Sequence, residues 1–405
     1  MRFSFVVALA FVVALTSFIF VSAASAQTFS NIYSFDGNVG LQLWGGVILD
    51  KAGNLYGTTI FGGAFGAGIV YELSPNGSNW TETTLYAFTG GTDGGAPEAS
   101  LVMDAAGNLY GSTTGFNGSN GTVFELSPAG GGTWTYKLLH SFGNGTDGIG
   151  PAGNLIFDAA GNLYGVTTSG GTTVHGTVFE LSPDGTGGWT ESILYNFQGG
   201  SDGLGPMGGL VFDTKGKLFG TTQMGGSFKQ GTIYELSLVN GTWQETVLTS
   251  LNKNTGFFPE AGLAIDNKNR LYAITLKGGP GPAAGPTVIE LAPTANGKFT
   301  KKVIYVFGTN PGDGGLPEAA LTVGPKGSLY GTTLTGGNQP CICGTVFELT
   351  RGTNGTWTET ILHNFTTQNG DEPRSTPVFD TAGNLYGTSK YGASFFGSVF
   401  KITPH

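Results

Sequence analysis

The chain has 405 residues, of which 72 are glycine, and 12% of the residues are aromatic. So much glycine without the three-residue period of collagen, beside that share of aromatic residues, excludes a triple helix and a disordered chain. The 18 Lys and Arg against 27 Asp and Glu give a net charge of -9, which would repel phosphate backbones and excludes nucleic acid as a favoured partner.

Residues 1–26 have the features of a secretory signal peptide. Arg2 precedes a largely apolar run over residues 5–21, and Ala24-Ser-Ala26 matches the A-x-A cleavage pattern. We therefore expect cleavage before Gln27 and a mature protein that is secreted, either extracellular or periplasmic. The alternative is an uncleaved membrane anchor, because the apolar run is close to the length that spans a bilayer. No second run of that length follows, so we expect no membrane contact after cleavage.

One short sequence recurs along the rest of the chain, and Asp158-Ala-Ala-Gly-Asn-Leu-Tyr-Gly-Val-Thr-Thr168 is one copy. Its aromatic position falls at Tyr56, Tyr110, Tyr164, Phe219, Tyr272, Tyr330 and Tyr386. Successive subtraction gives steps of 54, 54, 55, 53, 58 and 56 residues. A period slightly above 50, built from strand-like segments, is typical of a propeller or an array.

Each copy contains four predicted strands. In one copy, residues 154–158 and 162–168 form a hairpin, residues 176–182 a third strand, and residues 189–197 a fourth. Seven repeats of about 55 residues with four antiparallel strands each predict an all-β, seven-bladed β-propeller over residues 27–405. The first strand of each blade should line the axis.

The two ends of the propeller sequence complement one another. Asn31–Phe35 copies the fourth strand of the other repeats, whereas Ser398–Thr403 copies the third strand and no fourth strand follows it. We therefore expect the N-terminal strand to complete the last blade. This pairing would close the ring and remove the exposed sheet edge.

The repeated blocks Y-G-T-T, G-T-V-F-E-L-S-P and W-T-E-T-x-L-Y-x-F carry a family resemblance. Over residues 28–405 the chain resembles the GloVer-type bacterial tandem-repeat family. The resemblance implies a secreted or surface-attached repeat protein, often with a separate C-terminal anchor. The sequence shows neither an apolar tail nor a sorting motif before His405, so we expect free secretion.

One position varies where the rest of the repeat is monotonous. Immediately before the first strand of each blade the aligned residues are Trp44, Glu98, Ala152, Met207, Glu260, Glu318 and Arg374. A position with a common packing role would repeat. Because the inner strands converge on the axis, we expect these side chains to surround the mouth of the channel. Our binding-site hypothesis comprises Trp44, Glu98, Glu260, Glu318 and Arg374, with a sugar stacked on Trp44.

Seven loop aromatics are predicted on the same face: Phe61, Phe65, Phe116, Phe228, Tyr391, Phe395 and Phe396. Exposed aromatic faces beside acids and amides would suit a neutral sugar. The alternative is that these rings fold back onto the blade edges, and the sequence favours this alternative.

No catalytic constellation is found. His140 and His363 stand where other repeats have tyrosine, His175 lies on a loop and His405 is terminal, so neither a Ser-His-Asp triad nor a zinc pattern can be assembled. We predict no catalytic residue, no metal and no cofactor. The favoured function is a monomeric binding scaffold for a glycan, a cell-surface polymer or a surface protein. The alternative is a polysaccharide lyase or hydrolase that uses Glu260 and Glu318, the one pair of acids at the mouth on adjacent blades.

Two further features have a structural interpretation. The interblade Asp-Gly pairs begin at Asp93, Asp147, Asp202 and Asp313; they favour turns over calcium sites, because one Asp per blade does not gather enough ligands. Cys341 and Cys343 favour a local disulfide in an oxidising compartment over free thiols or a metal site.

Overall fold

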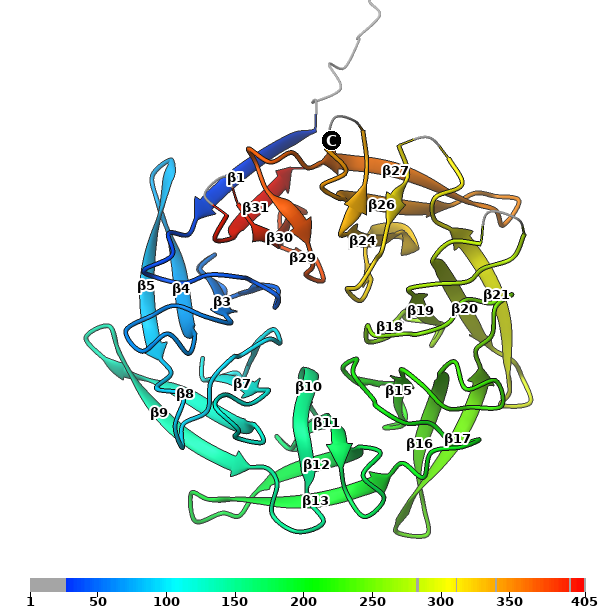
Figure 1. The fold of residues 1–405 in the computed structure, drawn as a ribbon, viewed down its shortest axis with the longest axis horizontal. Helices are drawn as coiled ribbons and strands as arrows, with labels where there is room; N and C mark the ends of the chain where they lie inside the picture. Colours follow the sequence, from blue (N-terminus) through cyan, green and yellow to red (C-terminus); the bar gives the residue numbers. More distant parts are fainter. Residues whose placement is uncertain (1–26, 282–283, 311, 339–340, 393–394, 404–405) are drawn as a thin grey trace, which may run out of the picture.

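The computed structural model describes residues 27–403, apart from residues 282–283, 311, 339–340 and 393–394. Seven antiparallel sheets, six with four strands and one with five, stand as blades around a central axis (Figure 1). The predicted seven-bladed β-propeller is thus confirmed. The predicted signal peptide, residues 1–26, lies outside the described residues. Within the described part of the chain, no helix is long and apolar enough to cross a bilayer.

Each blade runs from a strand at the axis, which has two residues in every blade except the third, to a strand of seven to nine residues at the rim. The innermost strands are β2 (Ile48–Leu49), β6 (Val102–Met103), β10 (Gly148–Phe157), β14 (Val211–Phe212), β18 (Ala264–Ile265), β23 (Thr322–Val323) and β29 (Val378–Phe379). The second strands are β3 (Leu55–Thr59), β7 (Leu109–Thr113), β11 (Leu163–Gly170), β15 (Leu218–Thr222), β19 (Leu271–Thr275), β24 (Leu329–Thr333) and β30 (Leu385–Tyr391).

The two outer strands of each blade have six to nine residues. The third strands are β4 (Ile69–Asn76), β8 (Thr122–Gly130), β12 (Thr177–Pro183), β16 (Thr232–Val239), β20 (Thr287–Pro293), β26 (Thr345–Arg351) and β31 (Ser398–Thr403). The rim strands are β5 (Asn79–Ala87), β9 (Thr133–Ser141), β13 (Trp189–Asn196), β17 (Thr242–Ser250), β21 (Phe299–Val306), β27 (Trp357–Asn364) and β1 (Thr28–Ser34). The short elements β22 (Gly314–Gly315), β25 (Thr335–Gly336), β28 (Asp371–Pro373) and the 3-10 helix η1 (Pro325–Gly327) complete the set.

The ring is closed by strand exchange between the chain ends. β1 pairs antiparallel with β31, from Thr28 opposite Thr403 to Ser34 opposite Ser398. The strand begins three residues before the predicted Asn31, and the next residue, Phe35, still donates its backbone N–H to the Gly397 carbonyl at 3.0 Å. The last blade therefore receives its rim strand from the N-terminus, as predicted (Figure 1).

The core consists of packed layers between blades. Seven clusters of buried residues each combine side chains from two neighbouring blades. In six of these interfaces the aromatic residue that follows one rim strand meets, edge to face, an aromatic residue on the third strand of the next blade. Ring centroids are 4.9–5.2 Å apart in the pairs Phe35–Tyr71, Phe88–Phe124, Phe142–Phe179, Phe197–Tyr234, Phe307–Phe347 and Phe365–Phe400. We call this contact the aromatic interlock.

The glycine of the Y-G-T-T block makes room for the interlock. A Cβ atom on Gly165 would lie 2.5 Å from the Phe179 ring, closer than non-bonded carbon atoms approach. The fifth blade lacks both the glycine and the aromatic residue of its third strand. Ala273 and Ile289 occupy these two positions. The interface is completed by Leu251, which is buried with Ile289 in one cluster. The substitutions compensate one another in volume.

The repeated Asp-x-x-Gly-Asn-Leu-Tyr sequence is a self-contained turn. Oδ1 of Asp158 accepts the backbone N–H groups of Ala160 and Asn162 at 2.8 and 2.9 Å. Its Oδ2 accepts the Asn162 side-chain amide at 2.8 Å and the Tyr164 hydroxyl at 3.1 Å. Although burial opposes ionisation, these hydrogen bonds hold the pKa of Asp158 below its usual value. Asp158 thus caps this turn.

Deletion of the mature residues through Phe35 should remove the rim strand of the last blade. The β31 edge would then be exposed, and Tyr71 would have no Phe35 ring to pack against, so we expect aggregation or a large fall in melting temperature. Size-exclusion chromatography and calorimetry test this. A truncated protein that remains monomeric with an unchanged melting temperature would contradict the closure.

Two interlock positions carry a hydroxyl that the fold does not use. The Tyr71 and Tyr234 side chains are fully buried, and their hydroxyls have no hydrogen-bond partner among the described residues. Because an unsatisfied buried hydroxyl costs about 1 kcal/mol or more, Tyr234→Phe should raise the melting temperature. The reverse change in a sister blade, Phe124→Tyr, should lower it. If Tyr234→Phe left the melting temperature unchanged or lowered it in thermal unfolding, these hydroxyls would be satisfied in solution.

Candidate binding site at the mouth of the channel

A backbone kink at the start of each blade aims one side chain at the axis. The kink residue has a positive φ and is followed by proline in six blades and by Leu43 in the first. Five kink residues are not glycine: Gln42, Ala96, Phe258, Leu316 and Glu372 have φ values of 49–60°. This left-handed region is costly for bulky side chains, and such strain is concentrated at functional sites. The residue after the proline is the variable position identified in the sequence.

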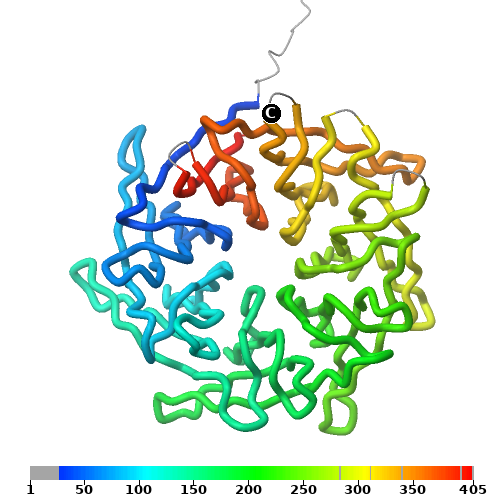
Figure 2. Tube along the Cα trace, in the orientation of Figure 1, coloured from blue at the N-terminus to red at the C-terminus, as the bar shows by residue number. Residues whose placement is uncertain are grey.

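All seven variable residues line one central cavity of about 520 Å³. The innermost turns of the blades converge around this axis (Figure 2). The structure thus brings together Trp44, Glu98, Glu260, Glu318 and Arg374, with Ala152 and Met207 completing the ring. We call these seven residues the mouth ring. Below them the cavity is lined by small and aliphatic residues, including Gly208, Ala320 and Val378.

Threonine side chains fix the mouth ring to neighbouring blades. The first threonine of Y-G-T-T donates its hydroxyl to the carbonyl of the residue that follows a mouth-ring position on the next blade. The pairs are Thr58 to Ala99 at 3.2 Å, Thr221 to Ala261 at 3.1 Å, Thr332 to Ser375 at 3.0 Å and Thr388 to Gly45 at 3.0 Å. The backbone under the mouth is therefore held across blade boundaries.

Trp44, Glu318 and Arg374 form one contact group. The Arg374 guanidinium lies over the Trp44 ring, 4.1 Å from its centroid, and forms an ion pair with Glu318. One indole face is therefore covered by arginine, which the stacking hypothesis did not anticipate. The Trp44 indole N–H is buried and has no acceptor among the described residues. Buried polar groups are nearly always hydrogen-bonded, so a donor without a partner among the described residues is unusual.

The other two acids each have a polar, uncharged neighbour, and Glu98 is also influenced by the Arg374 charge. Gln223 donates its side-chain amide to Glu260 Oε1 at 2.7 Å. Burial raises the pKa of Glu98 even though the Thr114 hydroxyl and the Arg374 charge favour the ionised form. Burial also raises the pKa of Glu318; the Arg374 charge opposes this shift, and the Glu260 charge adds to it. The mouth thus combines positioned hydrogen-bond donors and acceptors in one cavity.

Sequence reasoning missed the residues that support the ring. Thr114, Gln223 and Lys390 come from the position directly after Y-G-T-T, and Lys390 pairs with Glu372 at 2.9 Å. This position also varies among the blades, which is a signal the sequence contained: Ile60, Thr114, Thr168, Gln223, Leu276, Leu334 and Lys390. It lies at the end of the second strand or next to that end.

The loop aromatics divide into two groups. Phe61 and Phe116 are half-buried and lie edge to face across a blade boundary, with ring centroids 6.4 Å apart. In contrast, Phe65, Phe228 and Phe395 are exposed by 61%, 56% and 73%. The expectation that these rings fold back is therefore wrong for the latter group. Phe396 is also exposed, whereas Tyr391 is half-buried beneath Lys390.

The interblade aspartates stabilise turns, but they also meet acids from the next blade. Asp202 accepts the Tyr195 hydroxyl at 3.0 Å and the Gln198 backbone N–H at 2.6 Å. Burial, together with the charge of Asp202, raises the pKa of Glu245 to about 7. Burial and the contact with Asp313 raise the pKa of Glu359 to about 8. The sequence did not predict these carboxyl pairs, because their members lie on different blades.

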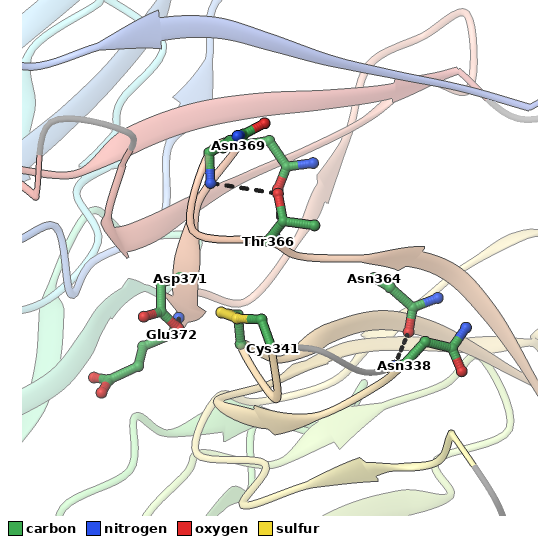
Figure 3. The surroundings of a disulfide bond; sticks show 9 residues. Asn338, Cys341, Asn364, Thr366, Asn369, Asp371 and Glu372 are labelled. Carbon is green, nitrogen blue, oxygen red and sulfur yellow. Dashed lines mark hydrogen bonds between the residues drawn. A yellow bond between two sulfur atoms is a disulfide. The ribbon is translucent and has the colours of Figure 1, made fainter.

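Cys341 and Cys343 are joined by a disulfide in the long loop of the sixth blade (Figure 3). The Asp371 side chain lies beside it in the same view. Cys343 is buried in the core cluster between the sixth and seventh blades, and its carbonyl accepts the Glu372 N–H at 3.1 Å. The disulfide therefore closes a local loop, which the packing and the carbonyl of Cys343 hold against the next blade.

Comparison with known proteins places the chain in a repeat family and supports its fold. A family model described as the Gloeobacter/Verrucomicrobia repeat matches residues 15–223 and 206–405. No curated protein matches. The crystal structure of a proposed 6-phosphogluconolactonase from Bacteroides uniformis ATCC 8492 is similar, with 19% identity, a TM-score of 0.54, and coverage of 82% of this chain and 88% of that one. A protein of unknown function from Dyadobacter fermentans DSM 18053 has 13% identity, a TM-score of 0.43, and coverage of 76% and 94%. At such identities the first likeness shows the fold alone.

The carboxyl pairs should make stability depend on pH. In the folded protein Glu245 and Glu359 keep a proton up to pH values of about 7 and 8, whereas in the unfolded chain glutamate loses it near about 4.3. The stabilisation is therefore complete below the unfolded pKa and is lost as pH rises through the folded values. We expect the melting temperature to fall between pH 5 and pH 9, measured in the presence of EDTA.

The double variant Glu245→Gln and Glu359→Gln should reduce this dependence, because an amide imitates the protonated carboxyl group. A third pair, Glu191 with Asp147, remains, since burial and Asp147 raise the pKa of Glu191 to about 8. Glu180→Gln is the matched control, since Glu180 accepts the nearby Ser182 hydroxyl at 3.0 Å. A slope in the double variant as steep as in the wild type would assign the pH dependence to other groups.

Proposed function

The chain belongs to the Gloeobacter/Verrucomicrobia repeat family, and from that premise we propose that it is a secreted, monomeric binding scaffold. Its ligand is a neutral glycan, free or carried on a cell-surface polymer, and it binds at the mouth ring. The single observation that carries the proposal is the buried Trp44 N–H without a partner among the described residues, in a cavity whose lining differs from blade to blade.

The chemistry of the mouth ring suits sugar hydroxyls. A hydroxyl both donates and accepts, so one sugar can accept from the Trp44 N–H and donate to a carboxylate such as Glu260. A cavity of about 520 Å³ is within the range of small-ligand sites and can hold one or two sugar rings. Three carboxylates against one guanidinium disfavour an anionic ligand. The exposed loop phenylalanines supply apolar faces for further units of a polymer.

The secreted location rests on two observations from different parts of the chain. The first 26 residues have the pattern of a cleaved signal peptide. The Cys341–Cys343 disulfide suits an oxidising compartment, since cytosolic thiols are kept reduced.

The alternative of a polysaccharide hydrolase or lyase is less well supported. Its carboxylate pair would need one free acid and one free base or nucleophile. Glu318 is instead paired with Arg374, and Glu260 accepts the Gln223 amide. Both carboxylates are thus held by positioning contacts of the kind that a binding site needs.

A glycan array with the mature protein tests the proposal. Trp44→Phe keeps an aromatic ring under Arg374 but removes the N–H, and Glu260→Gln removes one charge without changing shape. We expect each variant to bind the recognised glycan at least about 10-fold more weakly, equivalent to about 1.4 kcal/mol. Glu180→Gln is the control for the second change and should bind normally.

Two results would count against the proposal. Binding that survives both variants would place the glycan site away from the mouth ring. If no glycan binds to the wild-type protein, the sugar proposal fails.

A further inference from the structure

A cluster of metal-ligating side chains lies at the rim, outside the mouth ring. His140 comes from β9, Asp147 from the loop before β10, and Glu191 from β13 of the next blade. His140 Nε2 lies 3.0 Å from Asp147 Oδ2 and 3.9 Å from Glu191 Oε1. One ligand atom from each residue lies within 4.8 Å of both others. Three potential ligands thus meet across one blade boundary.

The cluster is nearly enclosed but open enough for an ion to enter. The side chains of Asp147, Glu191 and His140 are exposed by 6%, 15% and 20%. Glu191 Oε1 is buried and has no hydrogen-bond partner among the described residues. Asp147 and Glu191 are two largely buried carboxyl groups close together, and no Lys or Arg in the described chain forms an ion pair with either of them. A divalent ion would replace the proton that so close a pair of buried carboxyl groups shares.

The sister blades provide an internal comparison. The equivalent groups are Tyr195 with Asp202 and Glu245, and Tyr305 with Asp313 and Glu359. There the phenol donates to a carboxylate, at 3.0 Å to Asp202 and at 3.2 Å to Asp313. A phenol that donates a proton leaves the acids paired with each other, whereas a neutral imidazole offers a nitrogen lone pair. The pair of acids thus occurs at these three blade junctions, whereas an imidazole stands beside the acids only at the junction with His140.

The second histidine of this strand position has different surroundings. His363 faces the Asn369 amide at 3.1 Å and stacks on Phe29, with ring centroids 3.6 Å apart. Burial lowers the pKa of His363 to about 4. It is a neutral aromatic replacement, as the sequence indicated. His140 differs because two carboxylates from two blades converge on its ring.

The spacing of the ligand atoms suits zinc. Zinc binds imidazole nitrogen and carboxylate oxygen at about 2.0–2.2 Å in tetrahedral sites, which separates neighbouring ligands by about 3.4 Å. The 3.0 and 3.9 Å separations bracket that value. Calcium would need six or more oxygen ligands and is disfavoured by the imidazole. We propose that His140, Asp147 and Glu191 bind one Zn²⁺ ion, with water as the fourth ligand, and that the ion clips the second blade to the third.

The test is a calorimetric titration of EDTA-treated, dialysed mature protein with ZnCl2. We expect one ion per chain, and a melting temperature that rises by several degrees with zinc. His140→Tyr should abolish both effects without unfolding the protein, because it copies Tyr195 and retains the edge-to-face contact that His140 makes with Phe142. Glu191→Gln should weaken binding. His175→Ala, on an outer loop, is the control and should bind like wild type.

Three outcomes would overturn the proposal. If the wild-type protein binds no zinc, His140, Asp147 and Glu191 form a hydrogen-bonded cluster with a structural role alone. Binding that persists in His140→Tyr would place the ion elsewhere, for example at His175. Binding by the wild type that is equally strong with CaCl2 would identify a carboxylate site in which the imidazole plays no part.

Discussion

The fold depends on the aromatic interlock between neighbouring blades. A blade of four short strands cannot bury its own faces, so each blade must be covered by the next. The residue after the rim strand performs this role, as where Phe88 meets Phe124. Each such pair adds about 0.5–1.5 kcal/mol to the free energy of unfolding beyond its area burial. The glycine of Y-G-T-T, the length of the rim strand and the closure by β1 all follow from the need to fill each junction, with this contact in six of them and with Leu251 and Ile289 in the other.

The fifth blade shows that the constraint concerns volume and not identity. With Ile289 in place of an aromatic ring, alanine is tolerated at position 273, and Leu251 takes the place of phenylalanine. Packed interiors accept such exchanges when the total volume is kept. Residues therefore repeat at the positions that pack between blades. Positions that vary without compensation, such as the mouth ring, are free of that constraint and available for recognition.

Much of the fold could be predicted from sequence because its signals are local. The period, the turn around Asp158 and the strand-like blocks each act over a few residues, and the unmatched Asn31–Phe35 and Ser398–Thr403 segments required closure. The placement of Trp44 and Glu260 at the axis also followed from the repeat alignment. What the sequence could not reveal were distances between blades. The Arg374–Trp44 stacking, the Gln223–Glu260 hydrogen bond and the meeting of Glu191 with His140 join positions whose spacing carries no signal.

The central claim is that repeated positions maintain the structure and the mouth ring does not. Its most direct measurement is the melting temperature of a variant in which Trp44, Glu98, Glu260, Glu318 and Arg374 are all alanine, as Ala152 already is in the third blade. The reference is the single interlock variant Phe88→Ala, for which a loss of about 3–5 kcal/mol is typical of buried phenylalanine. We predict that the fivefold mouth variant melts above Phe88→Ala. A mouth variant that melts at or below the temperature of Phe88→Ala would contradict the claim.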